Sequence, residues 1–95
     1  MEPIPIGTVV DYHGSHTHGR YVVTDHYTVT PELFSQSEMR IMEENSVKLD
    51  ESYPDGVMYV IWRQGVLRKF GNRMYMIARV RRQSLTVTDE PPEVV

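Results

Sequence analysis

The stretch Met74–Thr88 reads MYMIARVRRQSLTVT and holds the clearest strand pattern in the chain. Because successive strand side chains point to opposite faces, one face is predicted to be apolar and the other to carry cations. The alternation breaks after Arg82 and resumes at Leu85, which predicts a strand, a tight turn at Arg81–Ser84 and a short closing strand. The predicted apolar face contains Met74, Met76, Ala78 and Val80, and the opposite face contains Tyr75, Ile77, Arg79 and Arg81.

The chain upstream of this stretch supplies the other strands of the fold. Apolar and β-branched runs occur at Thr8–Tyr12, Arg20–Val29 and Val57–Trp62, separated by segments that contain Gly or Pro. The continuous apolar run Val57–Trp62 is typical of a central strand. Residues Val66–Phe70 are predicted to form either a brief strand or part of a hairpin whose tip is Gly71-Asn72. Together these patterns predict a mostly β fold.

The segment 30–49 is predicted to be a helical insertion between two strands. Thr30-Pro31-Glu32 combines an N-cap hydroxyl, a proline at the first helical position and a carboxylate in the first turn. A thin apolar stripe follows, from Leu33 to Met42. We therefore expect one short α-helix, although Met39–Leu49 fits a strand as well. Asp50–Gly56 predicts a turn.

Length and composition are typical of a single domain over residues 1–95. Of the 95 residues, 40% are hydrophobic and 24% are charged. Residues 1–6 predict an extended lead-in and residues 89–95 a loose acidic tail. No apolar run approaches the roughly 18 residues that a membrane span needs. The absence of cysteines and of a signal-peptide pattern at Met1 favours a cytoplasmic protein.

Charge is segregated along the chain. The net charge is -3, yet residues 32–55 sum to -5 and residues 56–88 to +7, with no Asp or Glu in the latter segment. Such charge segregation indicates either an oppositely charged partner or neutralisation of one segment by the other, and it does not indicate a particular fold. The acidic segment is therefore either a cover for the basic one or a separate surface.

Two segments carry a resemblance to a known group of proteins. GTVVDYHGS…HGRYVV at residues 7–23 and VRRQSLT at residues 80–86 resemble the small SH3-like β-barrel proteins of unassigned role that actinobacteria and their phages encode. The layout is also similar to KOW and Tudor-type barrels. The resemblance implies a five-stranded SH3-like barrel with a non-catalytic role, in the host cytoplasm if a phage encodes it. The helical insertion departs from the minimal barrel.

The basic C-terminal third is the favoured functional surface. Guanidinium groups pair with carboxylates and phosphates, and aromatic rings offer stacking faces. We favour an acidic protein partner, with nucleic acid (DNA or RNA) as the alternative, because the sequence pI of about 5.7 is low for a nucleic-acid binder. Solvated or internally neutralised arginines are the simpler interpretation. The candidate contact residues are Arg63, Arg68, Lys69, Arg73, Tyr75, Arg79, Arg81, Arg82 and Trp62.

Two further modes of protein binding follow from the same features. SH3-like barrels offer an aromatic groove between loops, and the aromatic residues here suffice to line one, although a small core uses the same residue types. Self-association through an exposed strand edge would give a homodimer. The aromatic candidates for the groove are Tyr12, Tyr21, Tyr27, Tyr59 and Trp62.

The histidine-rich loop is a weaker candidate. The spacing of His13, His16 and His18 could bring imidazole nitrogens around a metal ion, but a solvent-exposed loop has the same composition, and structural zinc sites usually add cysteines. Ser15, His16 and Asp11 can be combined into a hydrolase triad on paper, yet no nucleophile-elbow sequence surrounds them. We therefore expect neither an enzyme nor a cofactor, and metal binding remains an alternative.

Overall fold

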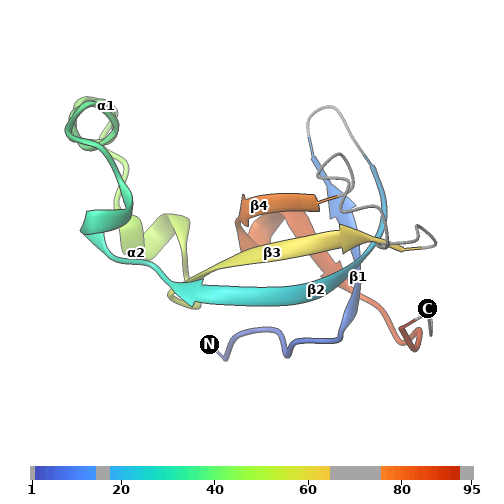
Figure 1. Cartoon of the computed structure of the whole chain (residues 1–95). Helices are drawn as coiled ribbons and strands as arrows, with labels where there is room; N and C mark the ends of the chain where they lie inside the picture. Colours follow the sequence, from blue (N-terminus) through green and yellow to red (C-terminus); the bar gives the residue numbers. More distant parts are fainter. Residues whose placement is uncertain (1, 15–17, 65–75, 93–95) are drawn as a thin grey trace.

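The computed structural model shows a mostly β protein built on one open antiparallel sheet of five strands (Figure 1). It describes residues 2–14, 18–64 and 76–92. The strand order is β4-β3-β2-β1-β5, and within the described residues no pairing joins β4 to β5. The strands are β1 (Val9–His13), β2 (His18–Thr28), β3 (Val57–Arg63), β4 (Met76–Val80) and β5 (Leu85–Val87).

The strands lie where the hydrophobic patterns predict them. The run Val57–Trp62 forms the body of β3, which pairs on both sides, with β2 and with β4. The tight turn before the closing strand is a 3-10 helix, η4 (Arg82–Ser84). The predicted hairpin at Val66–Phe70 and the residues Met74 and Tyr75 lie outside the described residues.

A cluster of buried hydrophobic side chains lies on one face of the sheet. Alternate residues of β3 belong to it, because the side-chain period of a strand is two. Val9, Val22 and Met58 are buried as well but lie outside this cluster. Ile4, from the N-terminal lead-in, is only 2% exposed and belongs to the same cluster, so the lead-in is part of the core. The buried cluster contains Ile4, Val10, Tyr21, Val23, Val57, Tyr59, Ile61, Val80 and Leu85.

Strand β4 departs from the predicted alternation. Ile61 pairs with Ile77 and Tyr59 with Val80, so β4 has one more residue than β3 between these pairs. Ile77 and Val80 both pack on the core as a result, while Ala78 and Arg79 are exposed. The prediction that put Ile77 with the cations and Ala78 on the apolar face is therefore wrong. A bulge reverses the faces of a strand, and the sequence pattern alone does not reveal it.

The insertion between β2 and β3 contains more than the single helix predicted. It starts with a 3-10 turn, η1 (Pro31–Leu33), and continues with α1 (Gln36–Glu44) and α2 (Leu49–Ser52). The signal at Thr30-Pro31 marks only η1, after which Phe34 returns to an extended conformation. The first part of the predicted turn Asp50–Gly56 belongs to α2, and the turn itself is closed by the Gly56 N–H, which donates to the Tyr53 carbonyl at 2.9 Å.

A capping box fixes the start of α1. The Ser35 hydroxyl accepts a hydrogen bond from the Glu38 N–H, and the Glu38 carboxylate accepts one from the Ser35 N–H, each at 3.1 Å. Two donors that the first helical turn leaves free are thereby satisfied. The helix starts at Gln36 for this reason, and not at Pro31.

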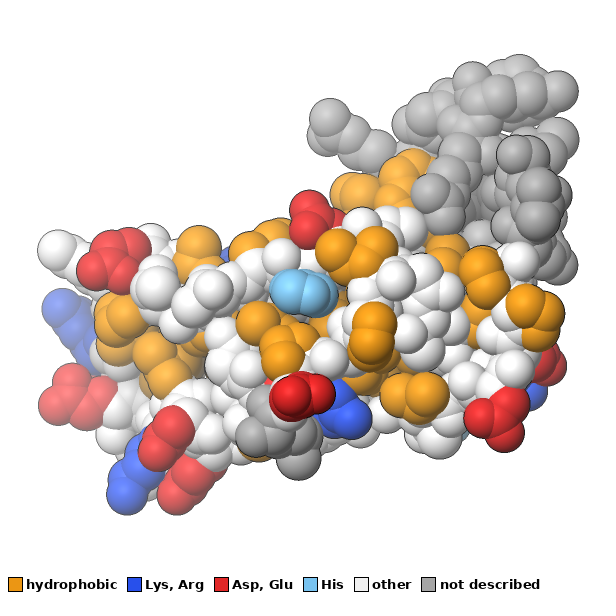
Figure 2. Space-filling view, turned by 90° about the horizontal axis from the view of Figure 1, so that it is seen from below, with side chains coloured by type: hydrophobic (Ala, Val, Ile, Leu, Met, Phe, Trp, Pro, Cys, Tyr) orange, Lys and Arg blue, Asp and Glu red, His pale blue; other side chains and the backbone are white. Residues whose placement is uncertain are grey.

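We call residues 30–55 the helical arm, because Figure 1 shows α1 projecting away from the sheet. None of the residues of η1, α1 and α2 is buried, and Ile41 is 58% exposed. In Figure 2 charged side chains lie at both ends of the face shown and at a few places near its middle, and hydrophobic side chains are spread along its length. No described helix is both long and apolar enough to cross a bilayer.

Candidate binding site

The predicted cations that the structure describes are spread over several elements. Arg63 ends β3, Arg79 lies in β4, and Arg81 and Arg82 lie at η4. Trp62 is half-buried beside Arg63, and Trp62 pairs with Met76 across the ladder. The remaining predicted contact residues, Arg68, Lys69, Arg73 and Tyr75, lie outside the described residues.

Arg82 is partly buried and connects η4 to the helical arm and to the N-terminal lead-in. Its guanidinium lies 3.7 Å from the carboxylate of Asp55, whose side chain is fully buried, and 3.4 Å from the carbonyl oxygen of Glu2. Asp55, at the end of the acidic segment 32–55, thus neutralises Arg82, in agreement with the interpretation that some arginines are neutralised internally. Arg82 is a structural residue in this arrangement.

The Asp55 carboxylate also accepts a hydrogen bond from the hydroxyl of Tyr59, which is fully buried in the middle of β3. The same hydroxyl accepts the N–H of Ile4 at 2.8 Å. Burial, reinforced by the nearby Asp55, raises the pKa of Tyr59 above its ordinary value. This network joins the lead-in, β3 and η4, and it serves the fold.

Arg79 faces the part of the helical arm that contains η1 and the start of α1. Its φ is 59°, a left-handed conformation that a residue with a Cβ rarely adopts outside turns and strained sites. The guanidinium lies 5.2 Å from the centre of the Phe34 ring, a cation–π geometry. It also lies 3.4 Å from the Glu38 carboxylate and 3.5 Å from the Leu33 carbonyl oxygen.

An apolar hollow adjoins this arginine. It has a volume of about 410 Å³ and is lined by Tyr27, Leu33, Met58 and Arg79, and we call it the Arg79 depression. Met58 is 1% exposed, whereas Leu33 is 40% and Tyr27 37% exposed. The site therefore combines a buried methionine, two accessible apolar side chains and one cation.

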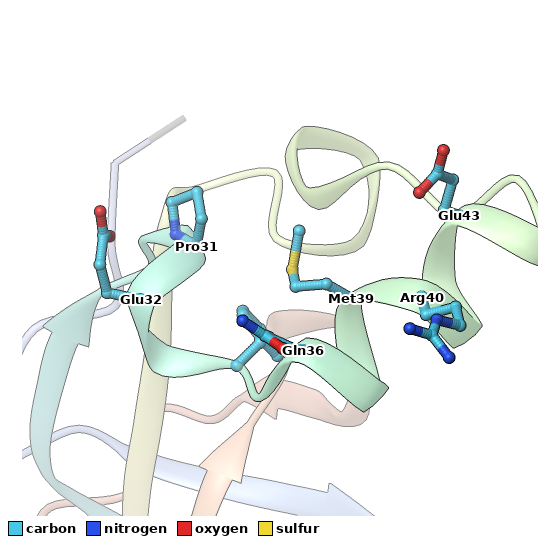
Figure 3. A pocket seen from close by; sticks show the side chains of 7 residues that line it. Pro31, Glu32, Gln36, Met39, Arg40 and Glu43 are labelled. Carbon is cyan, nitrogen blue, oxygen red and sulfur yellow. The ribbon is translucent and has the colours of Figure 1, made fainter.

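A second hollow lies along η1 and α1 (Figure 3). Its volume is about 480 Å³, and Phe34 lines it together with Pro31, Glu32, Gln36, Met39, Arg40 and Glu43. Figure 3 shows the Pro31 and Met39 side chains on the same side of the arm. The Phe34 ring that lines this hollow is the ring on which Arg79 lies, and Arg79 lines the other hollow.

Arg79 and Glu38 bring charges of opposite sign together beside the depression. The Ser35 N–H, which donates to the Glu38 carboxylate, is the main cause of a pKa of Glu38 below its ordinary value, and Arg79 lowers it further. Glu38 is therefore ionised at neutral pH and faces Arg79 as a carboxylate. The side chains of Arg79 and Glu38 are 48% and 45% exposed, so water and other ions reach the pair.

Two of the three histidines of the predicted metal loop, His13 and His18, lie within the described residues. His13 pairs with His18 across the β1–β2 ladder, with ring centres 6.5 Å apart, and the His13 Nε2 lies 3.1 Å from the Thr86 hydroxyl. Over residues 2–14, 18–64 and 76–92, no three or more His, Cys, Asp or Glu side chains gather as a metal site. His16 and Ser15 lie outside these ranges, and the Asp11 carboxylate pairs with Arg20 at 2.8 Å.

Two residues of the Arg79 depression and the ring beneath Arg79 had no functional signal of their own in the sequence. Leu33 and Phe34 fit the apolar stripe of a helix, and Met58 fits a central strand. Of the aromatic candidates, Tyr21 and Tyr59 are core residues, while Tyr27 is accessible and lines the depression. The useful signal was the Ser35-Gln36-Ser37-Glu38 pattern of a capping box, which places Glu38 at the first turn of α1.

Comparison of the chain with protein-family models, with curated protein sequences and with solved structures gave no match.

Proposed function

We propose that the protein is a non-catalytic binding module that holds an acidic partner protein through its cationic, aromatic-bearing face. The observation that carries this proposal is the arrangement at Arg79, where an accessible guanidinium lies on an aromatic ring beside an open apolar hollow. Arginine and aromatic residues dominate the energetics of protein interfaces, and they do so next to apolar pockets. Arg81, two residues further along the chain, is exposed and would extend the positive potential around this anchor, whereas Arg63 lies at the end of β3 that pairs with Tyr21.

We also propose that the sheet is that of a small SH3-like barrel. Support comes from the strand order β4-β3-β2-β1-β5 and from the 3-10 turn that joins β4 to β5. In this interpretation the helical arm is an elaboration of the connection between β2 and β3. The arm supplies Leu33 and Phe34, so the site would be a product of the insertion.

A protein partner fits the site better than nucleic acid. Carboxylates lie next to the described part of the site: Glu38 pairs with Arg79, and Glu32 of η1 and Glu43 of α1 line the second hollow. These groups repel a phosphate backbone, whereas a protein surface can place single carboxylates among apolar side chains. Nucleic acid is the outcome that the following experiment would reveal if this reasoning fails.

The test compares a blocked peptide in which single glutamates are separated by serines, called the Glu-Ser peptide, with duplex and single-stranded DNA at low and moderate salt, by fluorescence anisotropy. We expect wild-type protein to bind the Glu-Ser peptide at low salt, and Arg79→Gln to weaken that binding severalfold. Arg20→Gln is the matched control, because Arg20 is an exposed cation that pairs with Asp11 and Glu90 away from the arm. No binding to the Glu-Ser peptide at low salt, or equal losses in both variants, would contradict the proposal. Tighter, steeply salt-dependent binding to DNA would establish the alternative.

A further inference from the structure

We infer that the Arg79 depression takes a leucine-sized side chain from a segment of the partner protein, and that an adjacent carboxylate of this segment replaces Glu38 on Arg79. This inference rests on the proposed function and specifies the ligand of its anchor. Glu38 is then a built-in competitor for the site.

The internal pair is weak enough to be replaced. The Arg79 and Glu38 side chains approach to 3.4 Å, which is longer than a good charge-assisted hydrogen bond, and both are almost half exposed. Exposed ion pairs of this kind contribute little to stability. Glu38 also keeps its other partner, the Ser35 N–H, after Arg79 is taken over. Replacement of Glu38 by the partner's carboxylate therefore leaves neither Arg79 nor Glu38 buried without a partner.

The apolar part of the ligand is set by the lining of the depression. Tyr27, Leu33 and Met58 are contributed by β2, η1 and β3, and none of them brings a charge. The volume of about 410 Å³ lies at the lower end of the roughly 300–1,000 Å³ that ligand pockets occupy. An aliphatic side chain that covers Leu33 and Tyr27 would remove accessible apolar surface from water, which favours binding.

The backbone of Arg79 gives an independent indication of a site. A left-handed conformation at a non-glycine residue costs free energy and persists where the surroundings hold it, often at ligand-binding positions. The bulge in β4 aims the side chain across β3 toward the arm. Arg79 is thereby presented at the rim of an apolar hollow, where a carboxylate next to an aliphatic side chain meets both.

The experiment titrates three tetrapeptides, blocked at both ends, into isotopically labelled full-length protein. Gly-Asp-Leu-Gly carries both features, Gly-Asn-Leu-Gly lacks the charge and Gly-Asp-Gly-Gly lacks the aliphatic side chain. NMR signals of the Met58 methyl, the Leu33 methyls and the Arg79 Nε–H report on the site. We expect Gly-Asp-Leu-Gly to shift all of these signals with a dissociation constant on the order of 1 mM, and the other two peptides to bind at least about fivefold more weakly.

Variants test the role of Glu38 directly. Glu38→Gln keeps a side chain that completes the capping box but removes the charge that competes for Arg79. We expect this variant to bind Gly-Asp-Leu-Gly about three- to fivefold more tightly than wild type. Glu44→Gln, an exposed position on the same helix, is the matched control and should leave the affinity unchanged within about twofold. Arg79→Gln should abolish the preference for the aspartate peptide over the asparagine peptide.

The outcomes separate this inference from the proposed function. If the Glu-Ser peptide binds through Arg79 but the three tetrapeptides bind equally, or Glu38→Gln does not tighten binding, the proposed function stands and this inference is wrong. If neither the Glu-Ser peptide nor any tetrapeptide binds, both are wrong. Tighter binding of octanoate than of Gly-Asp-Leu-Gly would assign the depression to a lipid-like carboxylate and overturn the peptide assignment.

Discussion

The guanidinium of Arg79 lies 5.2 Å from the centre of the Phe34 ring and thereby joins the edge strand β4 to the helical arm. The arm has no buried residue in η1, α1 or α2, so its position relative to the sheet depends on contacts of this kind. The bulge that presents Arg79 also interrupts the outer edge of β4, which discourages pairing with another strand. Arg79 therefore lies in the bulge at the sheet edge and also lines the Arg79 depression.

The left-handed backbone at Arg79 predicts an unusual order of stabilities. Both Arg79→Ala and Arg79→Gly lose the ring contact and the ion pair, but only alanine keeps the Cβ that opposes a φ of 59°. We expect the glycine variant to be more stable than the alanine variant by about 1 kcal/mol in urea unfolding. Ala78→Gly, one residue earlier, should instead lower stability by roughly 0.5–1 kcal/mol. The same order at both positions would mean that φ at Arg79 carries no strain.

The Tyr59 hydroxyl is predicted to be a main polar contributor to the core. Tyr59→Phe removes the donor to Asp55 and the acceptor of the Ile4 N–H, and leaves both groups without this partner. We expect a loss of about 1–3 kcal/mol in the free energy of unfolding. Tyr27→Phe is the control, since Tyr27 is accessible, and should stay within about 0.5 kcal/mol of wild type. Equal effects of the two substitutions would show that the hydroxyl network contributes nothing.

The raised pKa of Tyr59 predicts a stability change at alkaline pH. Burial holds the folded-state pKa of Tyr59 above the ordinary value of 10.0, so the unfolded chain releases this proton first. The stability that this pKa difference contributes is fully present below pH 10.0, and it is lost as the pH rises from 10.0 through the folded-state pKa of Tyr59. Unfolding free energies at increasing pH should fall more steeply for wild type than for Tyr59→Phe, with Tyr27→Phe behaving as wild type. Parallel curves for all three proteins would contradict the pKa direction.

The sheet could be predicted because its signals are local. Val57–Trp62 is β-branched and aromatic throughout, and such a run has few stable positions other than a central strand. The bulge at Arg79 could not be predicted, because it depends on the register between β3 and β4 and leaves no mark in the local pattern. The sequence also predicted the start of the arm from Thr30, although the complete capping box at Ser35 was the stronger helix signal.

The site could be predicted only in part. Arg79 was a candidate because of its cationic segment, but its partners come from η1 and from α1. Contacts between segments so distant in sequence follow from tertiary packing, which composition does not encode. The neutralisation of Arg82 by Asp55 was foreseen as an alternative from charge segregation alone, since the acidic segment precedes the basic one.

The capping box of α1 predicts an effect that is local rather than global. Ser35→Ala removes the hydroxyl that accepts the Glu38 N–H, and caps of this kind stabilise a helix by about 0.5–2 kcal/mol. Because no residue of α1 is buried, fraying of this helix exposes little of the core, and the urea midpoint of the whole protein should stay close to wild type. Amide hydrogen exchange should accelerate severalfold at Met39 and Asn45, whose N–H groups bond within or at the end of α1, and remain unchanged in β3.

Thr30→Ala is the matched control, since the Thr30 side chain makes no cap hydrogen bond to η1, and should leave exchange in α1 unaltered. A drop in global stability for Ser35→Ala would show instead that the arm and the sheet unfold as one unit.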